Sequence, residues 1–189
     1  MSNFRGSLSG VKVVIDGSNI ARSGPEEKGE VNITVKKIVQ AMVELNKNGC
    51  TDIQVFCDAN LRHLIVDIEQ YDLLLKNGTI IQTPAKFQAD PYIIKYAKEE
   101  GAMILTNDKF KDFRENDSWV KENIDRRIIG FIIVKNRFML AWNKEESEKI
   151  RNDTTAETKE TVSDGPYKDK LTFGILDSIY NRNKKSDGR

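Results

Sequence analysis

Short runs of branched aliphatic residues alternate with longer amphipathic segments over most of the first 140 residues. Residues 11–15 (VKVVI) are almost continuously apolar, which is typical of a strand buried on both faces of a parallel sheet. Residues 33–48 place apolar side chains every three or four positions, which predicts a helix, and Gly49 suits its end. Residues 16–19 (DGSN) between these segments predict a turn.

The same patterns predict the remaining elements as far as residue 140. We expect strands at 52–57, 79–82 and 102–105, and helices at 64–76, 90–100 and 109–123, the last interrupted near Asn116-Asp117. Two further strands, at 127–134 and 137–140, are expected to form a hairpin around Lys135-Asn136. Because strands alternate with helices, the pattern indicates a three-layer α/β domain with a mainly parallel central sheet.

The pattern changes after residue 142. Residues 143–164 are polar and charged, which predicts a mobile insert or a solvated helix. An apolar stretch at 171–180 predicts a helix that docks on the domain, and the chain then ends in a basic tail. We therefore expect a domain at 1–142, an insert at 143–164 and a C-terminal helix with its tail at 165–189.

Charge and cysteine content narrow the classes of function. The 189 residues include 30 Lys and Arg and 29 Asp and Glu, so a globally basic nucleic-acid clamp is excluded and any anionic partner needs a local patch or metal ions. Cys50, Cys57 and the single histidine, His63, cannot supply a disulfide framework or a four-ligand zinc site. No apolar stretch is long enough for a signal peptide or a membrane span, so we expect a cytoplasmic protein with no membrane partner.

Acidic side chains follow several of the predicted strands. Asp16 comes directly after the first strand with Asn19 three residues on, Asp58 follows the second strand and Asp108 the fourth. Asp90 opens a predicted helix, and one helical turn beyond Asp108 stands one more acid, Asp112. The carboxyl ends of parallel strands meet at one edge of a sheet, so these acids should share a rim, where their mutual repulsion favours bound cations.

Each acid also has a structural explanation. Asp90 before Pro91 could cap its helix, and Asp58 and Asp108 could cap the segments that begin after them. Asp112 could be an exposed helix residue. Asp16 fits such an explanation least well, because it directly follows a buried strand and Asn19 can share its turn.

Carboxylates without a histidine or thiolate set point to a hard cation, Mg²⁺ or Mn²⁺. Such ions bind phosphate, deprotonate water and stabilise the leaving oxygen of a phosphodiester. The sequence contains no GxxxxGK[ST] loop, no GxGxxG and no evident Ser/His/Asp set, and one histidine excludes a paired-histidine nuclease mechanism.

Residues 13–21 (VVIDGSNIA) resemble the opening motif of NYN-domain ribonucleases, a branch of the PIN-like nucleases, and most closely the regnase type. Residues 52–57, 89–113 (with the Thr-Asn-Asp segment) and 126–140 resemble later parts of that domain, and Gly165-Pro166 with the apolar segment after it resembles its closing element. The similarity covers most of residues 11–140. The sequence has no counterpart of that family's CCCH zinc finger.

The resemblance implies a role for each acid. Asp16 becomes the principal metal-binding and catalytic aspartate with Asn19 as its polar partner, and Asp90 and Asp108 become further catalytic metal ligands. Asp112 falls on the next acid of the family's pattern and becomes a catalytic candidate, while Asp58 has no clear counterpart and is a weaker acidic candidate. The regnase-type pattern has two adjacent acids at the third helix, whereas here Ala89 precedes Asp90.

The family implies Mg²⁺- or Mn²⁺-dependent hydrolysis of single-stranded or loop RNA, which requires basic side chains to hold the flanking phosphates. The candidates near the predicted rim are Arg22, Lys28, Arg62, Lys86, Lys109 and Lys111, with ordinary surface charge as the alternative for each. Phe87 and Tyr92 could stack on a base, although we expect both in the core. A homodimer is compatible with the resemblance, although no feature of the sequence points to one.

Three alternative functions fit parts of the sequence. A haloacid-dehalogenase-like phosphatase would need Asp-x-Asp after the first strand, whereas the chain has Asp16-Gly17-Ser18. A catalytically inactive RNA-binding or scaffold protein of the same fold would be expected to have lost some of these acids. A PIN-type toxin remains open, although the DGSN motif and the long polar insert favour the NYN branch.

Overall fold

The computed structural model describes residues 8–24 and 32–141, and the expected insert at 143–164 and C-terminal helix at 165–189 lie outside that part. The chain runs through β1 (Lys12–Asp16), α1 (Gly17–Arg22), α2 (Val35–Lys47), β2 (Asp52–Cys57), the 3-10 helix η1 (Ala59–His63), α3 (Ile68–Lys76), β3 (Ile80–Gln82), α4 (Asp90–Glu100), β4 (Met103–Leu105), α5 (Lys111–Arg114), α6 (Ser118–Arg127), β5 (Ile128–Val134) and β6 (Arg137–Ala141). The predicted alternation of strands and helices is confirmed.

One six-stranded sheet has the order β3-β2-β1-β4-β5-β6. The first five strands are parallel, and β6 pairs antiparallel with β5 as the predicted hairpin. The strand order reverses between β1 and β4, and ligands of open α/β sheets bind at such a switch point, outside the carboxyl ends of the strands. We therefore expect a ligand site at the carboxyl ends of β1 and β4.

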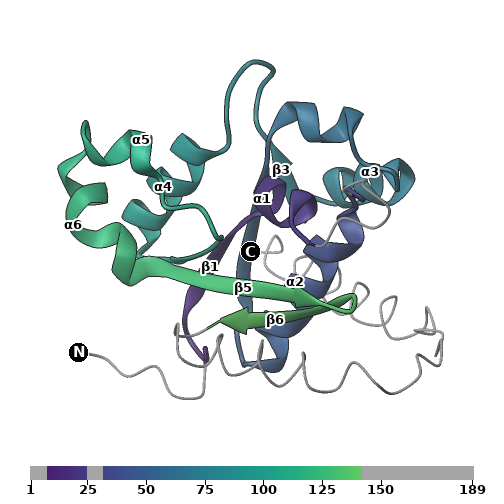
Figure 1. Cartoon of the computed structure of the whole chain (residues 1–189), viewed down its shortest axis with the longest axis horizontal. Coiled ribbons are helices and arrows are strands. Elements are labelled where there is room, and N and C mark those ends of the chain that lie inside the picture. The colour runs from purple at the N-terminus through teal and green to yellow at the C-terminus, as the bar shows by residue number, and fades with distance from the viewer. Residues whose placement is uncertain (1–7, 25–31, 142–189) are drawn as a thin grey trace, which may run out of the picture. The chain divides into compact units, whose positions relative to one another are not determined.

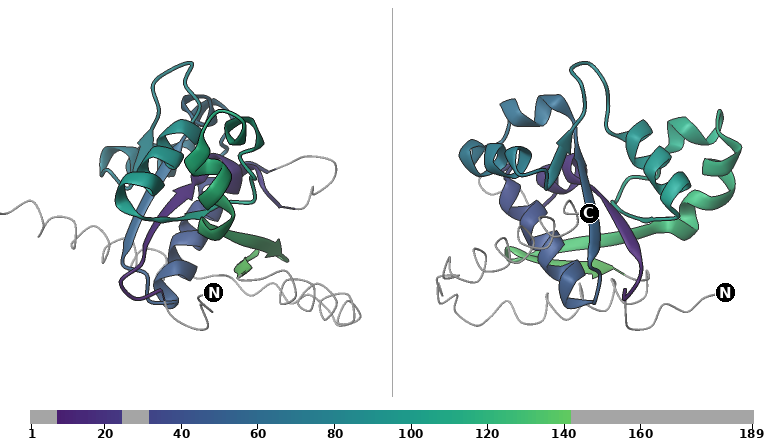
Figure 2. Two further views of the ribbon diagram at one scale, coloured as in Figure 1. Left: turned by 90° about the vertical axis from the view of Figure 1, so that its left-hand side faces the viewer. Right: turned by 180° about the vertical axis from the view of Figure 1, so that it is seen from behind.

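Helices cover both faces of this sheet, and Figures 1 and 2 show α4 and α6 together on one side and α2 and α3 on the other. The side chains of Val14, Ile93, Ile104 and Ile124 belong to one buried cluster between the sheet and the α4–α6 layer. The three-layer α/β architecture is thus confirmed. No helix within residues 8–24 and 32–141 combines the length and apolarity that crossing a membrane requires.

The helix predicted at 64–76 is wrong over its first four residues, and α3 begins only at Ile68. Asp67 explains the difference, because its Oδ1 and Oδ2 accept hydrogen bonds from the backbone N–H groups of Val35 (2.8 Å) and Lys36 (3.2 Å). The side chain thereby caps the start of α2 instead of its own helix. The preceding Val66 N–H bonds to Ile33 O, which holds the segment in a non-helical path.

Two smaller expectations also change. Residues 16–19 do not form a free turn, because α1 begins at Gly17, immediately after the last residue of β1. The expected core position of Phe87 is wrong, since this side chain is 61% exposed. Tyr92 is partly buried and its ring packs against that of Phe56, with 6.4 Å between the centroids.

Candidate active site

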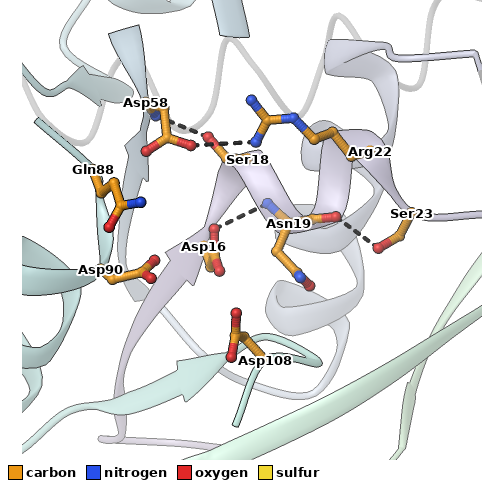
Figure 3. A pocket seen from close by; sticks show the side chains of 9 residues that line it. All are labelled: Asp16, Ser18, Asn19, Arg22, Ser23, Asp58, Gln88, Asp90 and Asp108. Carbon is orange, nitrogen blue, oxygen red and sulfur yellow. Dashed lines mark hydrogen bonds and ion pairs between the residues drawn. The ribbon is translucent and has the colours of Figure 1, made fainter. Parts of the chain in front are cut away.

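A pocket of about 400 Å³ opens at the carboxyl ends of β1 and β2, beside the first residue of α4. Figure 3 shows the side chains that line it, Asp16, Ser18, Asn19, Arg22, Ser23, Asp58, Gln88, Asp90 and Asp108. Four of these are carboxylates, and they come from segments as far apart as residues 16 and 108. The structure therefore brings the predicted acids onto one rim.

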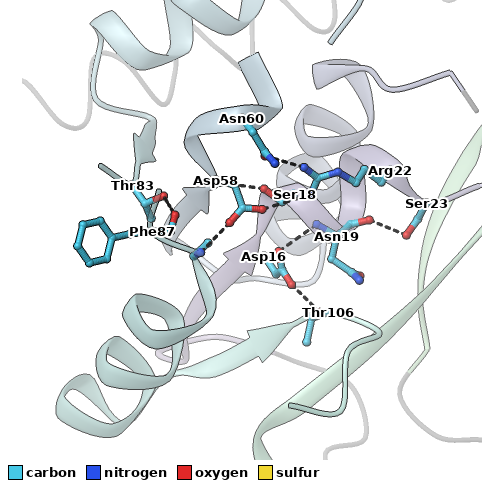
Figure 4. A network of polar contacts seen from close by, with 11 residues as sticks. Asp16, Ser18, Asn19, Arg22, Ser23, Asp58, Asn60, Thr83, Phe87 and Thr106 are labelled. Atoms are coloured by element: carbon cyan, nitrogen blue, oxygen red, sulfur yellow. Dashed lines mark hydrogen bonds and ion pairs between the residues drawn. The ribbon is translucent and has the colours of Figure 1, made fainter. Parts of the chain in front are cut away.

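Asp16 lies at the bottom of this pocket and is only 4% exposed. Its Oδ1 accepts a hydrogen bond of 3.0 Å from Asn19 N–H, and its Oδ2 accepts one of 3.0 Å from the Thr106 hydroxyl (Figure 4). Burial chiefly, and the charge of Asp90 in addition, raise the pKa of Asp16, while the two hydrogen bonds lower it, and the net result is a pKa of about 7. In the absence of a cation, this carboxyl is therefore partly protonated at neutral pH.

Gly17 lets α1 start directly against β2. A Cβ at this position would lie 2.4 Å from Cys57 Sγ and 3.0 Å from Phe56 O, so no larger residue fits without a shift of the backbone. The next residue, Ser18, accepts a hydrogen bond of 2.8 Å from Asp58 N–H. The two residues thus fix α1, and with it the Asp16 side chain that caps α1, to the end of β2.

Asn19 connects α1 to the segment after β4. Its Oδ1 accepts a hydrogen bond of 3.1 Å from Asn107 N–H. The Asn107 side chain in turn donates to Phe131 O (3.0 Å) and accepts from Phe131 N–H (3.1 Å), and so continues the β4–β5 pairing beyond Leu105. Asn19 was predicted to be the polar partner of Asp16. In the structure its side chain joins the strand ends that carry Asp16 and Asp108.

Asp90 is the first residue of α4 and is half-buried. The N-cap position belongs to Ala89 and no side chain caps this helix, so the capping explanation for Asp90 is wrong. Burial, followed by the charges of Asp108, Asp58 and Asp112, raises the pKa of Asp90 to about 6. Ala89 itself is 1% exposed and packs in the core, so position 89 adds no oxygen to the pocket.

Asp108 is exposed on the opposite side of the pocket and binds its own loop. Its Oδ1 accepts a hydrogen bond of 2.7 Å from Phe110 N–H, a turn bond and not a helix cap, because α5 starts only at Lys111. Phe110 has a positive φ of 48° and a buried ring, so its packing fixes the donor that orients Asp108. A second pocket of about 500 Å³ adjoins the first, shares Asn19, Asp90 and Asp108 with it, and contains the exposed Asp112.

Both carboxylate oxygens of Asp58 accept hydrogen bonds. Its Oδ1 accepts a hydrogen bond of 2.7 Å from Ala89 N–H, and its Oδ2 accepts one of 3.2 Å from Arg22 Nη1 (Figure 4). Its side chain forms no capping bond to η1, so that structural explanation is wrong as well. Asp58 ties the end of β2 to the start of α4 and to α1.

The basic candidates separate into different environments. Arg22 lines the first pocket, Lys109 and Lys111 line the second, and Lys86 is exposed in a turn at a positive φ of 74°. Arg62 lines neither pocket and forms a two-bond ion pair with Asp72, at 2.7 Å for each bond. Lys28 lies outside the described residues.

Divalent cations fit this site by the chemistry of its donors. Asp16, Asp90 and Asp108 offer carboxylate oxygens, which Mg²⁺ and Mn²⁺ prefer. Burial chiefly, and neighbouring carboxylates in addition, raise the pKa values of Asp16 and Asp90, and a cation would neutralise these charges. Within residues 8–24 and 32–141, no three acidic, cysteine or histidine side chains are close enough to hold an ion by themselves.

Several residues in or beside the pocket were not among the predicted candidates. Ser18 and Thr106 belong to the DGSN and Thr-Asn-Asp motifs, so their position beside the acids was a signal that could have identified them. Gln88 and Ser23 line the pocket from loops, and no sequence pattern marks either residue.

Comparisons with known proteins agree with this geometry. A family model described as "Zc3h12a-like Ribonuclease NYN domain" matches residues 10–154. The chain is 23% identical to Endoribonuclease rege-1 of Caenorhabditis elegans over 140 residues, which make up 67% of this chain and 22% of that protein. The chain therefore spans about a fifth of the length of this relative.

Solved structures share the fold. The crystal structure of nuclear proteinaceous RNase P 2 (PRORP2) from Arabidopsis thaliana superimposes with a TM-score of 0.55 at 17% identity, over 69% of this chain and 29% of that one. A second structure of the same protein gives the same values. At this identity the likeness concerns the fold alone.

Proposed function

Because the chain belongs to the Zc3h12a-like ribonuclease NYN domain family, we propose that it is a Mg²⁺- or Mn²⁺-dependent endoribonuclease that hydrolyses single-stranded or loop RNA. The observation that carries the proposal is the pocket in which Asp16, Asp58, Asp90 and Asp108 converge at the carboxyl ends of the strands. Such a concentration of acids is costly without cations, and cations in turn attract the phosphates of a nucleic acid.

Asp16, Asp90 and Asp108 are the residues that would hold the metal in this proposal. A bound divalent ion supplies a more acidic water and stabilises charge on the phosphoryl and leaving oxygens. Asp16 is oriented for such a role by two hydrogen bonds and is shielded from bulk water. Asp108 keeps its Oδ2 free of the turn bond that Phe110 makes to Oδ1.

Asn19 and Asp112 have different parts in the proposal. Asn19 keeps the ends of β1 and β4 together through its bond to Asn107 N–H, so it maintains the spacing of the acids. Asp112 is exposed in the second pocket, where its charge reaches Asp90. We therefore expect its replacement to weaken cleavage less than replacement of Asp16.

The burial of Asp16 supports a preference for single-stranded RNA. The reacting phosphate must approach a carboxylate that is only 4% exposed, and a flexible single strand can bend to do so more easily than a duplex. Arg22 on one side and Lys109 and Lys111 on the other are the basic side chains that could hold the neighbouring phosphates.

Cleavage of a fluorescently labelled single-stranded RNA by the purified full chain tests the proposal. We expect cleavage with Mg²⁺ or Mn²⁺, none with EDTA, and a loss of about 10³-fold or more in Asp16→Asn, in keeping with the cost of removing a group that stabilises charge in the transition state. Circular dichroism would verify that the fold is retained.

Asp52→Asn is the matched control, because Asp52 is an exposed aspartate at the opposite end of β2. Its cleavage should equal that of the wild type. If neither metal supports cleavage, or if Asp16→Asn cleaves as fast as the wild type, the nuclease proposal fails. RNA binding without cleavage would then favour an inactive RNA-binding protein of the same fold.

A further inference from the structure

Within residues 8–24 and 32–141, the first pocket is lined by four carboxylates and by one cationic side chain, Arg22. A phosphodiester that enters such a pocket meets strong repulsion, which bound metal ions offset at the reacting phosphate. The adjacent phosphates of the strand need another positive group. Among the described residues that line this pocket, Arg22 is the only one whose side chain can provide it.

Arg22 is held in a fixed orientation by two residues from the end of β2 and the start of η1. Its Nη1 donates to Asp58 Oδ2 (3.2 Å) and its Nη2 donates to Asn60 Oδ1 (2.9 Å). A guanidinium has five N–H donors, so about three remain available. The side chain is 35% exposed, which leaves the group accessible from the pocket.

The three residues form a small unit that joins two elements. Arg22 is in the last turn of α1, whereas Asp58 and Asn60 lie more than 30 residues further along the chain. Asp58 is itself fixed by the Ala89 N–H, so the acceptor that orients Arg22 has little freedom. Figure 4 shows this arrangement, in which the guanidinium of Arg22 contacts both Asp58 and Asn60.

We propose that Arg22 binds an RNA phosphate adjacent to the bond that is cleaved, and that Asn60 and Asp58 are positioning residues that act through Arg22. The inference rests on the proposed ribonuclease function. Arg22 lines the same pocket as Asp16, but its guanidinium contacts Asp58 and Asn60 and none of the three acids proposed to hold the metal, which suits it to a phosphate next to the reacting one. The planar guanidinium, held on one edge, presents its remaining donors in a geometry that matches phosphate oxygens.

A purely structural ion pair is the alternative. A partly exposed pair of this kind contributes little to stability, and its loss would change the melting temperature slightly without changing how salt affects RNA binding. A phosphate contact behaves differently, because each one releases counterions and steepens the dependence of affinity on salt concentration. Salt dependence therefore separates the two roles.

The experiment measures the affinity of the purified 189-residue chain for a fluorescent single-stranded RNA by anisotropy, in EDTA and over a series of KCl concentrations. We expect Arg22→Gln to weaken binding about tenfold and to reduce the slope of log affinity against log salt by about one. The matched control is Arg62→Gln, which removes the same charge from an arginine that is also paired but lies outside both pockets. It should change affinity less than about twofold, in line with a charge that makes no phosphate contact.

Asn60→Ala tests the positioning role without changing the net charge. We expect it to weaken binding about threefold in the wild type and to have no further effect in Arg22→Gln, as a residue that acts only through Arg22 must. With Mn²⁺ present, Arg22→Gln should raise KM while kcat changes less than about twofold, because the contact is to a phosphate that does not react.

Several results would overturn the inference. They are equal losses in Arg22→Gln and Arg62→Gln, an unchanged salt slope in Arg22→Gln, and an Asn60→Ala effect that persists without Arg22. Failure of the wild type to cleave, with the Arg22-dependent salt slope intact, would instead overturn the ribonuclease function and leave the phosphate contact standing.

Discussion

The hydroxyl of Thr106, just beyond the end of β4, donates a hydrogen bond of 3.0 Å to Oδ2 of Asp16 at the end of the neighbouring strand β1. The oxygen of this hydroxyl also accepts a hydrogen bond of 3.0 Å from Asp108 N–H. Thr106 is completely buried, so water does not compete for either hydrogen bond. One hydroxyl thus sets the spacing between two of the proposed metal-binding acids.

Thr106→Val should therefore impair the site while preserving the shape of the side chain. We expect cleavage to fall about tenfold or more and the free energy of unfolding to fall by about 1–3 kcal/mol, because Asp16 loses a donor and Asp108 N–H loses its acceptor. Thr106→Ser keeps the hydroxyl and should keep most of the activity. Equal activity in the valine and serine variants would show that the hydrogen bond has no functional role.

The pKa of Asp16 predicts how the metal-free protein responds to pH. The ordinary value of 3.8 is raised to about 7 in the folded state, chiefly by burial. Between about pH 4 and pH 7 the folded state then binds more protons than the unfolded state, so the contribution of this group to stability falls as pH rises through that window and levels off above it. The rise in the pKa of Asp16 from 3.8 to about 7 corresponds to about 4 kcal/mol in the free energy of unfolding, at about 1.4 kcal/mol for each pKa unit.

Urea denaturation in EDTA at pH 5 and pH 8 measures this effect. Asp16→Asn should be more stable than the wild type at pH 8, and the difference should shrink at pH 5, where the wild-type carboxyl is largely protonated. The comparison isolates Asp16 from Asp90, whose raised pKa is present in both proteins. A difference that is the same at the two pH values would contradict the assigned shift.

Metal binding should stabilise the fold, because a cation removes the repulsion among the acids and binds only the folded arrangement. At millimolar Mn²⁺ we expect the melting temperature of the wild type to rise by several degrees. An ion at about 100 times its Kd stabilises the folded state by about 2.7 kcal/mol. Asp16→Asn should lose most of this shift and Asp52→Asn should retain it. A wild-type melting temperature that does not respond to Mn²⁺ or Mg²⁺ would argue against the proposed ligands.

Gly17 is predicted to be intolerant of substitution for a steric reason. Gly17→Ala should lower the free energy of unfolding by about 1–3 kcal/mol, because the new Cβ would lie 2.4 Å from Cys57 Sγ. Combining it with Cys57→Ala removes that sulfur and should recover part of the loss. If chemical denaturation shows no coupling between the two substitutions, the contact with Cys57 is not what requires glycine here.

Much of the fold and part of the site could be predicted from the sequence. The almost continuous apolar run at 11–15 identifies a strand buried on both faces, and the spacing at 90–100 identifies a helix with one buried face, because burial selects apolar residues at those positions. Asp16 and Asp108 could be assigned to one rim because parallel strands place their carboxyl ends at the same edge. The departure at Ala89 was also visible, although only the packing shows that its side chain belongs to the core.

Other features were decided by the tertiary structure alone. Whether Asp58 is a free carboxylate depends on Arg22 and on the Ala89 N–H, 36 and 31 residues away in the chain. The start of α3 depends on Asp67 capping a different helix, and the availability of Arg62 depends on Asp72. The sequence by itself determined the elements and the strand-end acids, because those follow from local periodicity and strand direction. Contacts between distant segments decide which charges are neutralised and which stay free in the pocket. No local pattern encodes such contacts.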